Sequence, residues 1–215
     1  MNEPRDNKPL MVLDLDHTLL DFSSKTLQRQ TGDSTPGAAA AAMKRPHMDL
    51  FLTTAYRHYD LVVWSQTSWR WLETKLTELG MLTHAGYKFC FVLDKTSMFA
   101  ITSTKRDGTS FKHQVKPLQL IWTKYPRWGP HNTVHLDDLS RNFALNIPNG
   151  LFVTAYYRKK MRRDVELMGL GKYLELLAQS GLSFDQVDFR RWIDVLSGKA
   201  QLVEATTEED KEDKP

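Results

Sequence analysis

Apolar residues in this chain gather in short runs, and each run is followed by a longer segment of mixed character. Mainly apolar runs between polar residues are typical of strands buried on both faces of a sheet, and they occupy residues 10–13, 61–64, 87–93, 133–136 and 151–154. Other segments repeat apolar positions every three or four residues, as amphipathic helices do, over residues 46–56, 67–80 and 116–125. This alternation predicts an α/β fold with a doubly wound parallel sheet.

Two further parts of the chain predict additions to this sheet. Residues 99–113 alternate loosely around Arg106, Asp107 and Gly108, a pattern typical of a small β-hairpin. Towards the C-terminus, the spacing of apolar residues predicts two helices, over residues 164–180 and 184–196. The gap after the first predicted strand holds one helix beside a polar, alanine-rich segment, and the gap after the second holds a helix, a strand and this hairpin, so neither gap predicts a large folded lid.

Two segments lack the composition of a packed core. Residues 23–43 are polar and then alanine-rich, which predicts a flexible insertion. Residues 203–215 are dominated by charged side chains, which predicts a disordered acidic tail. We therefore expect one domain over residues 8–200, interrupted by the flexible insertion.

Polar side chains follow three of the predicted strands directly. Asp14 and Asp16 come after the first run, Ser65 after the second, and Asp137 and Asp138 after the fourth. In parallel sheets, ligands bind beyond the carboxyl ends of the strands. Crowded carboxylates repel each other and lose solvation, and a cation is the usual remedy. Each acid alone could be a plain strand-end turn, but agreement at three strands favours a shared site.

Bulk composition excludes several classes of protein. The 215 residues carry a net charge of +3, and the isoelectric point of about 8.9 is too mild to indicate direct nucleic-acid binding. No apolar run reaches membrane-spanning length, and the polar N-terminus lacks the core of a secretory signal. The single cysteine, Cys90, excludes an internal disulfide, and Thr96 stands where a cysteine phosphatase loop would need an arginine. We expect a soluble intracellular protein without a membrane partner.

Several ordered motifs carry a resemblance to known enzymes. The sequence DLDHT at residues 14–18, together with Ser65, Lys116 and the pair Asp137-Asp138, resembles the haloacid dehalogenase superfamily of phosphotransferases. KRPHMDLFL, YDLVVWSQT, VKPL and HLDDLSRNF resemble the phosphatases that act on the carboxy-terminal domain of RNA polymerase II. DLVVWSQTSWRWLETKLTELG and YKFCFVLDKTSM are most similar to the ubiquitin-like-domain-containing branch. The resemblance covers about residues 10–196 without the ubiquitin-like domain, so we expect a shorter family member or a fragment.

The resemblance implies a role for each motif residue. Asp14 would be the nucleophile and form an aspartyl phosphate. Asp16 would protonate the leaving oxygen and then activate water. Ser65 and Lys116 would complete the catalytic set by holding phosphoryl oxygens and neutralising charge. The residues expected to bind phosphate or substrate are Thr18, Ser65, Lys116 and Arg70, with Thr18 mainly supporting the loop. His17 is expected to point away from this chemistry.

The same resemblance implies a bound Mg²⁺, a hard cation that prefers oxygen ligands. Its ligands would be the Asp14 carboxylate, the Asp16 backbone carbonyl and one acid of the Asp137-Asp138 pair. We favour Asp138 as the direct ligand, with Asp137 beside it. The sequence leaves the choice between the two open.

These expectations lead to one main functional hypothesis and two alternatives. The main hypothesis is a Mg²⁺-dependent protein serine/threonine phosphatase. Resemblance implies a nuclear location and phosphorylated substrates, either the RNA polymerase II C-terminal domain or subunits of the 26S proteasome. The absence of a large predicted lid favours a macromolecular substrate. The alternatives are a catalytically weak phosphopeptide-binding scaffold and a small-molecule phosphatase of the same superfamily.

Overall fold

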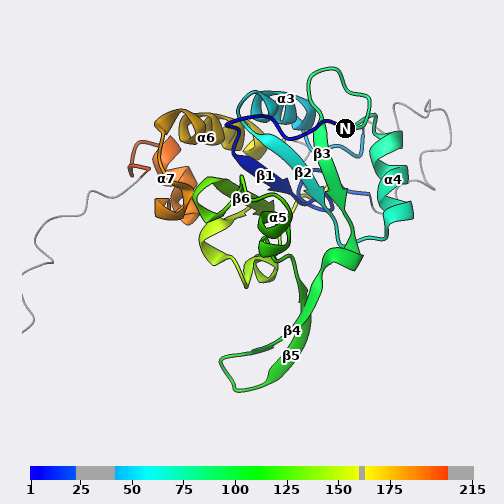
Figure 1. Cartoon of the computed structure of the whole chain (residues 1–215), viewed down its shortest axis with the longest axis vertical. Helices are drawn as coiled ribbons and strands as arrows, with labels where there is room; N and C mark the ends of the chain where they lie inside the picture. Colours follow the sequence, from blue (N-terminus) through cyan, green and yellow to red (C-terminus); the bar gives the residue numbers. More distant parts are fainter. Residues whose placement is uncertain (23–41, 160–162, 203–215) are drawn as a thin grey trace, which may run out of the picture.

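A five-stranded parallel sheet forms the centre of the molecule (Figure 1). The computed structural model describes residues 1–22, 42–159 and 163–202, so most of the expected insertion and the whole expected tail lie outside the described residues. The strands, in the order β3-β2-β1-β6-β7 across the sheet, are Phe89–Leu93, Asp60–Trp64, Leu10–Leu13, Thr133–Asp137 and Gly150–Phe152. All four neighbouring pairs are parallel. The predicted doubly wound sheet is confirmed, and its order reverses at β1.

Alternate side chains of β1 enter two separate cores, because successive residues of a strand point to opposite faces. Met11 and Leu13 join the larger core, and Leu10 and Val12 join the smaller one. The larger core includes residues of α3 (Met48–His58), α4 (Trp69–Glu78) and α6 (Glu166–Ser180). The smaller core includes residues of α5 (Gln119–Lys124). Helices therefore cover both faces, with α3 and α6 side by side (Figure 1).

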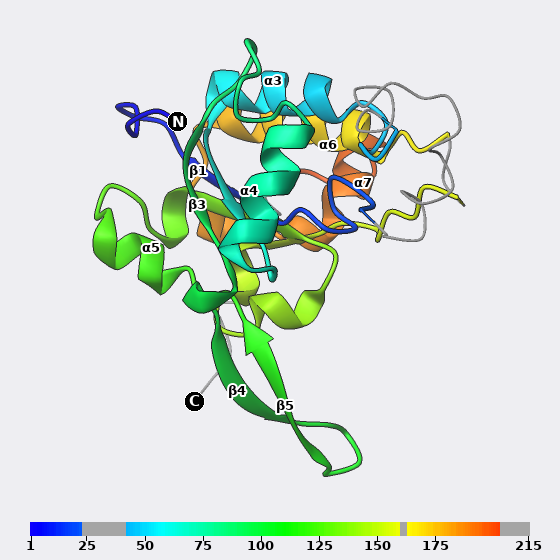
Figure 2. The same cartoon turned by 90° about the vertical axis from the view of Figure 1, so that its right-hand side faces the viewer.

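The predicted hairpin is present as an antiparallel ribbon outside the central sheet. It consists of β4 (Phe99–Thr104) and β5 (Ser110–Val115), and Gly108 adopts a φ of 83° in the turn between them. Most of its side chains are exposed, and it projects away from the rest of the molecule (Figure 2). Strand β5 ends at Val115, so the ribbon ends one residue before Lys116, a predicted site residue.

The C-terminal region differs from the single helix expected over residues 184–196. It forms two 3-10 turns, η5 (Phe184–Gln186) and η6 (Phe189–Arg191), before the short α7 (Trp192–Leu196). Val187 is extended, and the Asp188 side chain accepts a hydrogen bond from the Arg190 backbone, which starts a new turn. Phe184, Val187 and Phe189 all reach the core this way. Contacts with the core, and not the apolar spacing of residues 184–196, therefore set the path of this segment.

Other boundaries shift only slightly. Helix α3 begins at Met48, not at Pro46, because Lys44 still pairs with Leu20 in a β-bridge and His47 adopts a left-handed conformation. Short 3-10 turns occupy the connections, namely η1 (Lys95–Ser97), η2 (Pro130–Asn132), η3 (Ser140–Phe143) and η4 (Ile147–Asn149). Among the described residues, no helix has the length and apolar character of a membrane span.

Candidate active site

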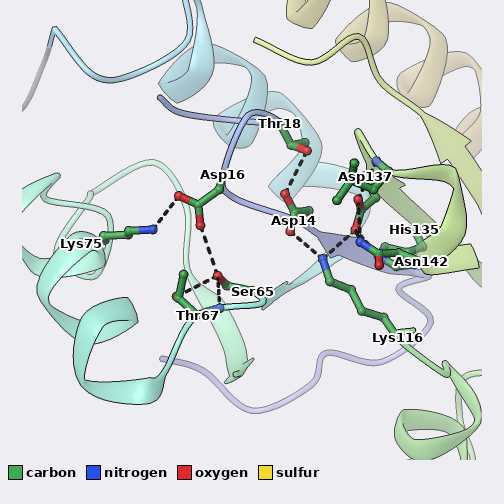
Figure 3. Close-up of polar contacts among 11 residues, drawn as sticks. Asp14, Asp16, Thr18, Ser65, Thr67, Lys75, Lys116, His135, Asp137 and Asn142 are labelled. Atoms are coloured by element: carbon green, nitrogen blue, oxygen red, sulfur yellow. Dashed lines mark hydrogen bonds and ion pairs between the residues drawn. The ribbon is translucent and has the colours of Figure 1, made fainter. Parts of the chain in front are cut away.

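A tight loop after β1 separates the two acids of the first motif. The Asp14 backbone N–H donates to the Leu136 carbonyl at 2.9 Å, which continues the sheet by one residue. The chain then turns back at His17, whose φ is 64°. The Asp14 and Asp16 carboxylates point to different sides of this loop (Figure 3). His17 itself bonds the Tyr156 carbonyl at 3.0 Å, as its expected structural role requires.

The first side of the loop holds a buried group that we call the inner cluster, made of Asp14, Lys116, Asp137 and Asp138. The Lys116 ammonium lies 2.5 Å from Asp14 Oδ1 and 2.6 Å from Asp137 Oδ2. Thr18 donates from its hydroxyl to Asp14 Oδ2 at 3.1 Å. Lysine and threonine thus fix both oxygens of the Asp14 carboxylate.

Within the inner cluster, Asp137 is fully occupied by protein partners. Asn142 donates to both of its oxygens, at 2.9 and 2.8 Å, and the Leu139 backbone donates at 2.9 Å. Burial alone would raise the pKa of Asp137, but the charge of Lys116 holds that pKa well below its ordinary value. His135 lies 3.5 Å away, and burial lowers its pKa, which keeps the imidazole neutral. Asp137 therefore anchors Lys116 as a permanent carboxylate.

Asp138 differs from its neighbour because no lysine or arginine nitrogen of the described residues lies within 4 Å of its carboxylate. Oxygens of Asp14, Asp137 and Asp138 nevertheless lie within 4.8 Å of one another. With all three carboxylates ionised, the cluster would carry two more negative charges than positive ones. Burial raises the pKa of Asp14 to about 7 against the lowering effect of Lys116, and burial also raises the pKa of Asp138. Such an oxygen-rich, electron-rich set fits a hard divalent cation such as Mg²⁺.

The other side of the loop holds a second group that we call the outer cluster, made of Asp16, Ser65, Thr67 and Lys75. Lys75 donates to Asp16 Oδ1 at 2.5 Å, and Ser65 donates to Asp16 Oδ2 at 3.4 Å. The Ser65 hydroxyl also lies 3.0 Å from the Thr67 hydroxyl and accepts from the Thr67 backbone at 3.2 Å. One third of the Asp16 side chain is exposed, against 2% of the Lys75 side chain. In its ionised form Asp16 balances the charge of Lys75, and solvent reaches the carboxyl group.

A buried arginine ties the loop to the C-terminal half of the chain. The Arg45 guanidinium donates to the Thr18 carbonyl at 3.1 Å and to the Thr154 carbonyl at 3.0 Å. It also pairs with Asp164 at 2.9 Å and Glu166 at 2.8 Å. Since Thr18 bonds Asp14, this arginine supports the geometry of the inner cluster.

The structure brings most of the predicted site residues together in these two clusters. Arg70 is the exception, because it is exposed near the start of α4, and its guanidinium has no hydrogen bond or ion pair with either cluster in the part of the chain that is described. Lys75 and Asn142 also belong to these contacts, although neither is among the predicted site residues. Lys75 carried a signal, since it interrupts the apolar stripe of α4 formed by Leu72, Leu76 and Leu79.

Comparisons with known proteins identify the family to which this chain belongs. Residues 9–186 match the family model of the NLI interacting factor-like phosphatases. Ubiquitin-like domain-containing CTD phosphatase 1 from Xenopus tropicalis is 37% identical over 195 residues, covering 89% of this chain and 56% of that protein. The Homo sapiens protein of the same name is 37% identical over 202 residues, covering 93% and 58%. The chain thus spans a little over half the length of these curated relatives.

Solved structures agree on the fold. Fcp1, described as an essential RNA polymerase II CTD phosphatase, superimposes with a TM-score of 0.58 at 13% identity, over 91% of this chain and 68% of that one. Fission yeast Fcp1 bound to beryllium fluoride gives a TM-score of 0.54 at 14% identity with the same coverage. At this identity, the likeness supports the fold alone. The sequence match, which covers most of the chain, shows that this protein belongs to the NLI interacting factor-like phosphatase family.

Proposed function

We propose that this chain is a Mg²⁺-dependent protein serine/threonine phosphatase that passes through an aspartyl phosphate on Asp14. The observation that carries the proposal is the buried inner cluster, in which three carboxylates lie close together and two of them, Asp14 and Asp137, contact Lys116. Such a site favours a divalent cation and, with it, the oxygens of a phosphoryl group. Family membership supports a phosphatase.

In the first half of the reaction, an Asp14 oxygen attacks phosphorus. The new oxygen–phosphorus bond forms while the bond from phosphorus to the serine or threonine oxygen breaks. Asp16 donates its proton to that leaving oxygen. Lys116 and Ser65 hold phosphoryl oxygens, and Thr18 keeps the Asp14 carboxylate oriented through its 3.1 Å hydrogen bond.

In the second half, water replaces the aspartate on phosphorus. Asp16, now a carboxylate, takes a proton from the water as its oxygen bonds to phosphorus. The bond from Asp14 to phosphorus breaks, and inorganic phosphate leaves. Asp16 ends the cycle protonated, as it began, so atoms and charges balance. Its partial exposure supports this role because both leaving group and water need access.

The fit of the donor set supports Asp138, not Asp137, as the direct Mg²⁺ ligand. Both Asp137 oxygens accept hydrogen bonds from Asn142, and one of them also contacts Lys116. Asp138 has no such partners in the described chain. Asp14 and Asp138 would hold the ion through carboxylates, and Asp16 through its backbone carbonyl. When bound, Mg²⁺ would neutralise charge on the phosphoryl oxygens.

The proposed substrate is a phosphorylated protein. The curated relatives carry the name CTD phosphatase, which supports the C-terminal domain of RNA polymerase II as one candidate. Proteasome subunits and a nuclear location rest on resemblance to the ubiquitin-like-domain-containing branch. The hairpin is a narrow projecting ribbon (Figure 2), and Asp16 is partly exposed, which supports an accessible site. Arg70 is a candidate contact for the peptide beyond its phosphate.

A direct assay tests this function. We expect the chain to release phosphate from a phosphoserine peptide and from p-nitrophenyl phosphate only with Mg²⁺, and to stop when a chelator is added. Asp14→Asn should lower turnover at least ~10⁴-fold because it removes the nucleophile, while its thermal melt stays cooperative. Full activity in this variant would overturn the mechanism. Binding of phosphopeptide without release, or a preference for phosphorylated metabolites, would replace the proposal by a scaffold or a small-molecule phosphatase.

A further inference from the structure

Lys75 is an unusual residue on α4 because it is charged and yet lies on the buried face of the helix. Its side chain is 2% exposed and sits among the buried positions Leu72 and Leu76. Burying an ammonium group is costly unless the charge is paired. Among the described residues, the Lys75 ammonium nitrogen forms an ion pair with Asp16 at 2.5 Å. The centre of the Phe22 ring lies 5.4 Å from the same nitrogen. The helix therefore delivers one positive charge to a single carboxylate.

The contact divides the two oxygens of the Asp16 carboxylate. Lys75 bonds Oδ1, whereas Oδ2 lies 3.4 Å from the Ser65 hydroxyl (Figure 3). Ser65 follows β2 directly and is one of the residues proposed to hold a phosphoryl oxygen. Thr67 fixes the Ser65 hydroxyl through two contacts of 3.0 and 3.2 Å. The oxygen that stays free of lysine is therefore the one that faces the proposed phosphoryl site.

We propose that Lys75 is a positioning residue, which clamps one oxygen of Asp16 so that the other carries the proton to the leaving group. This inference rests on the proposed phosphatase function and deepens it. In the proposed first step, the proton passes from Oδ2 to the serine oxygen as the bond from phosphorus to that oxygen breaks. In the second half, the same Oδ2 takes a proton from water. Lys75 keeps its own protons throughout, and the cycle balances as before.

If Lys75 positions Asp16 in this way, the effect of losing Lys75 on the rate of the first step should depend on the leaving group of the substrate. Serine leaves as a strongly basic alkoxide unless it is protonated, whereas p-nitrophenolate leaves readily without a proton. General acid catalysis contributes roughly 10²–10⁴-fold where it is needed. A displaced Asp16 should therefore slow the first step with a phosphoserine peptide and leave the first step with p-nitrophenyl phosphate nearly intact.

The experiment compares Lys75→Met, which keeps the length of the aliphatic chain but removes the charge, with the unchanged chain. Rapid-quench measurements with Mg²⁺ follow product release by the two substrates in the first turnover. We expect the phosphopeptide step to slow at least ~100-fold. With p-nitrophenyl phosphate, a burst of about one nitrophenolate per enzyme should persist and be followed by slow turnover, because water activation also uses Asp16. Lys75→Arg, which keeps the charge, should recover most of the lost phosphopeptide rate.

Controls separate this inference from the proposed function. Lys172→Met removes an exposed lysine from α6 and should behave as the unchanged chain with both substrates. An unchanged chain that hydrolyses neither substrate would sink the proposed function itself. If it hydrolyses both, equal slowing of the two first steps in Lys75→Met, or a phosphopeptide rate within threefold, overturns only the role of Lys75. If the thermal melt of Lys75→Met is not cooperative, the same two rates are measured with Lys75→Gln instead. The same outcomes then support or overturn the role of Lys75.

Discussion

The inner and outer clusters are built around two acids, Asp14 and Asp16, that stand two residues apart in sequence, and their environments differ in burial and in charge. Asp14 is buried, shares Lys116 with Asp137, and belongs to a group that would carry two excess negative charges with all its carboxylates ionised. Asp16 is one third exposed, and among the described residues it is the carboxylate that pairs with Lys75. Both acids come from one loop, and both meet a lysine at 2.5 Å. Identical side chains thus receive opposite environments.

These two environments allow one loop to supply two kinds of chemistry. A nucleophile gains from desolvation and from a fixed orientation, both of which the inner cluster provides. An acid and base must exchange protons with a leaving group and with water, which requires access. The loop after β1 makes this division possible, because its two carboxylates point to different sides (Figure 3).

The largest expected effect on stability comes from removing the lysine of each cluster in turn. Lys116→Met leaves the buried carboxylates of Asp14 and Asp137 without their shared cation, and we expect it to lose about 3–5 kcal/mol of unfolding free energy. Lys75→Met leaves a carboxylate that water can reach, so we expect a loss of only about 1–2 kcal/mol. Urea denaturation without metal at neutral pH measures both. Equal losses would show that burial does not separate the clusters.

The pH dependence of the unfolding free energy, measured without metal, tests the buried state of Asp14. Burial raises the pKa of Asp14 from 3.8 to about 7, so the folded protein holds a proton that the unfolded chain has lost. The stability contributed by this shift is complete below the unfolded pKa and disappears as pH rises through 7. Between pH 5 and pH 8, we expect the unchanged chain to lose on the order of 2 kcal/mol more than Asp14→Asn.

This window avoids the acid range in which Asp137 titrates, since its lowered pKa acts in the opposite direction. Urea denaturation at several pH values, in chelator, follows the effect. A stability that changes equally with pH in both proteins would contradict the assignment of the raised pKa to Asp14.

Magnesium should distinguish the clusters by a smaller effect. A ligand that binds only the folded state stabilises it by about 1.4 kcal/mol at tenfold its dissociation constant. We expect Mg²⁺ to raise the melting temperature of the unchanged chain and to have little effect on Asp138→Asn. Asp16→Asn should keep most of the shift, because only the backbone carbonyl of that residue is a proposed ligand. Loss of the shift in Asp16→Asn alone would move the ion to the outer cluster.

The smallest effect is expected at Arg70, which lies outside both clusters. Its guanidinium is exposed, so solvent and salt screen its attraction for a phosphopeptide. Arg70→Met should raise KM for a phosphopeptide roughly two- to fivefold and leave kcat unchanged. The rise should shrink at high salt. Lys124→Met, on the exposed side of α5, provides the matched control, and a fall in kcat would instead assign Arg70 to the catalytic step.

The central sheet could be predicted because its signal is local. Four-residue runs such as residues 10–13 have no polar position to expose, so a doubly buried strand is the structure that suits them. The C-terminal region could not be predicted equally well. Phe184, Val187 and Phe189 follow a path that the adjoining core decides, and the sequence pattern alone resembles one helix. Packing of this kind overrides local periodicity.

By itself, the sequence determined which acids end which strands, and therefore that Asp14, Asp137 and Asp138 share one edge of a sheet. Only the tertiary structure decided how their charges are paired. Lys116 lies 102 residues from Asp14, and Lys75 lies 59 residues from Asp16, so no local pattern connects either lysine to its carboxylate. The physical reason is that Coulomb attraction and desolvation depend on distance and burial in space, which the folded chain alone specifies.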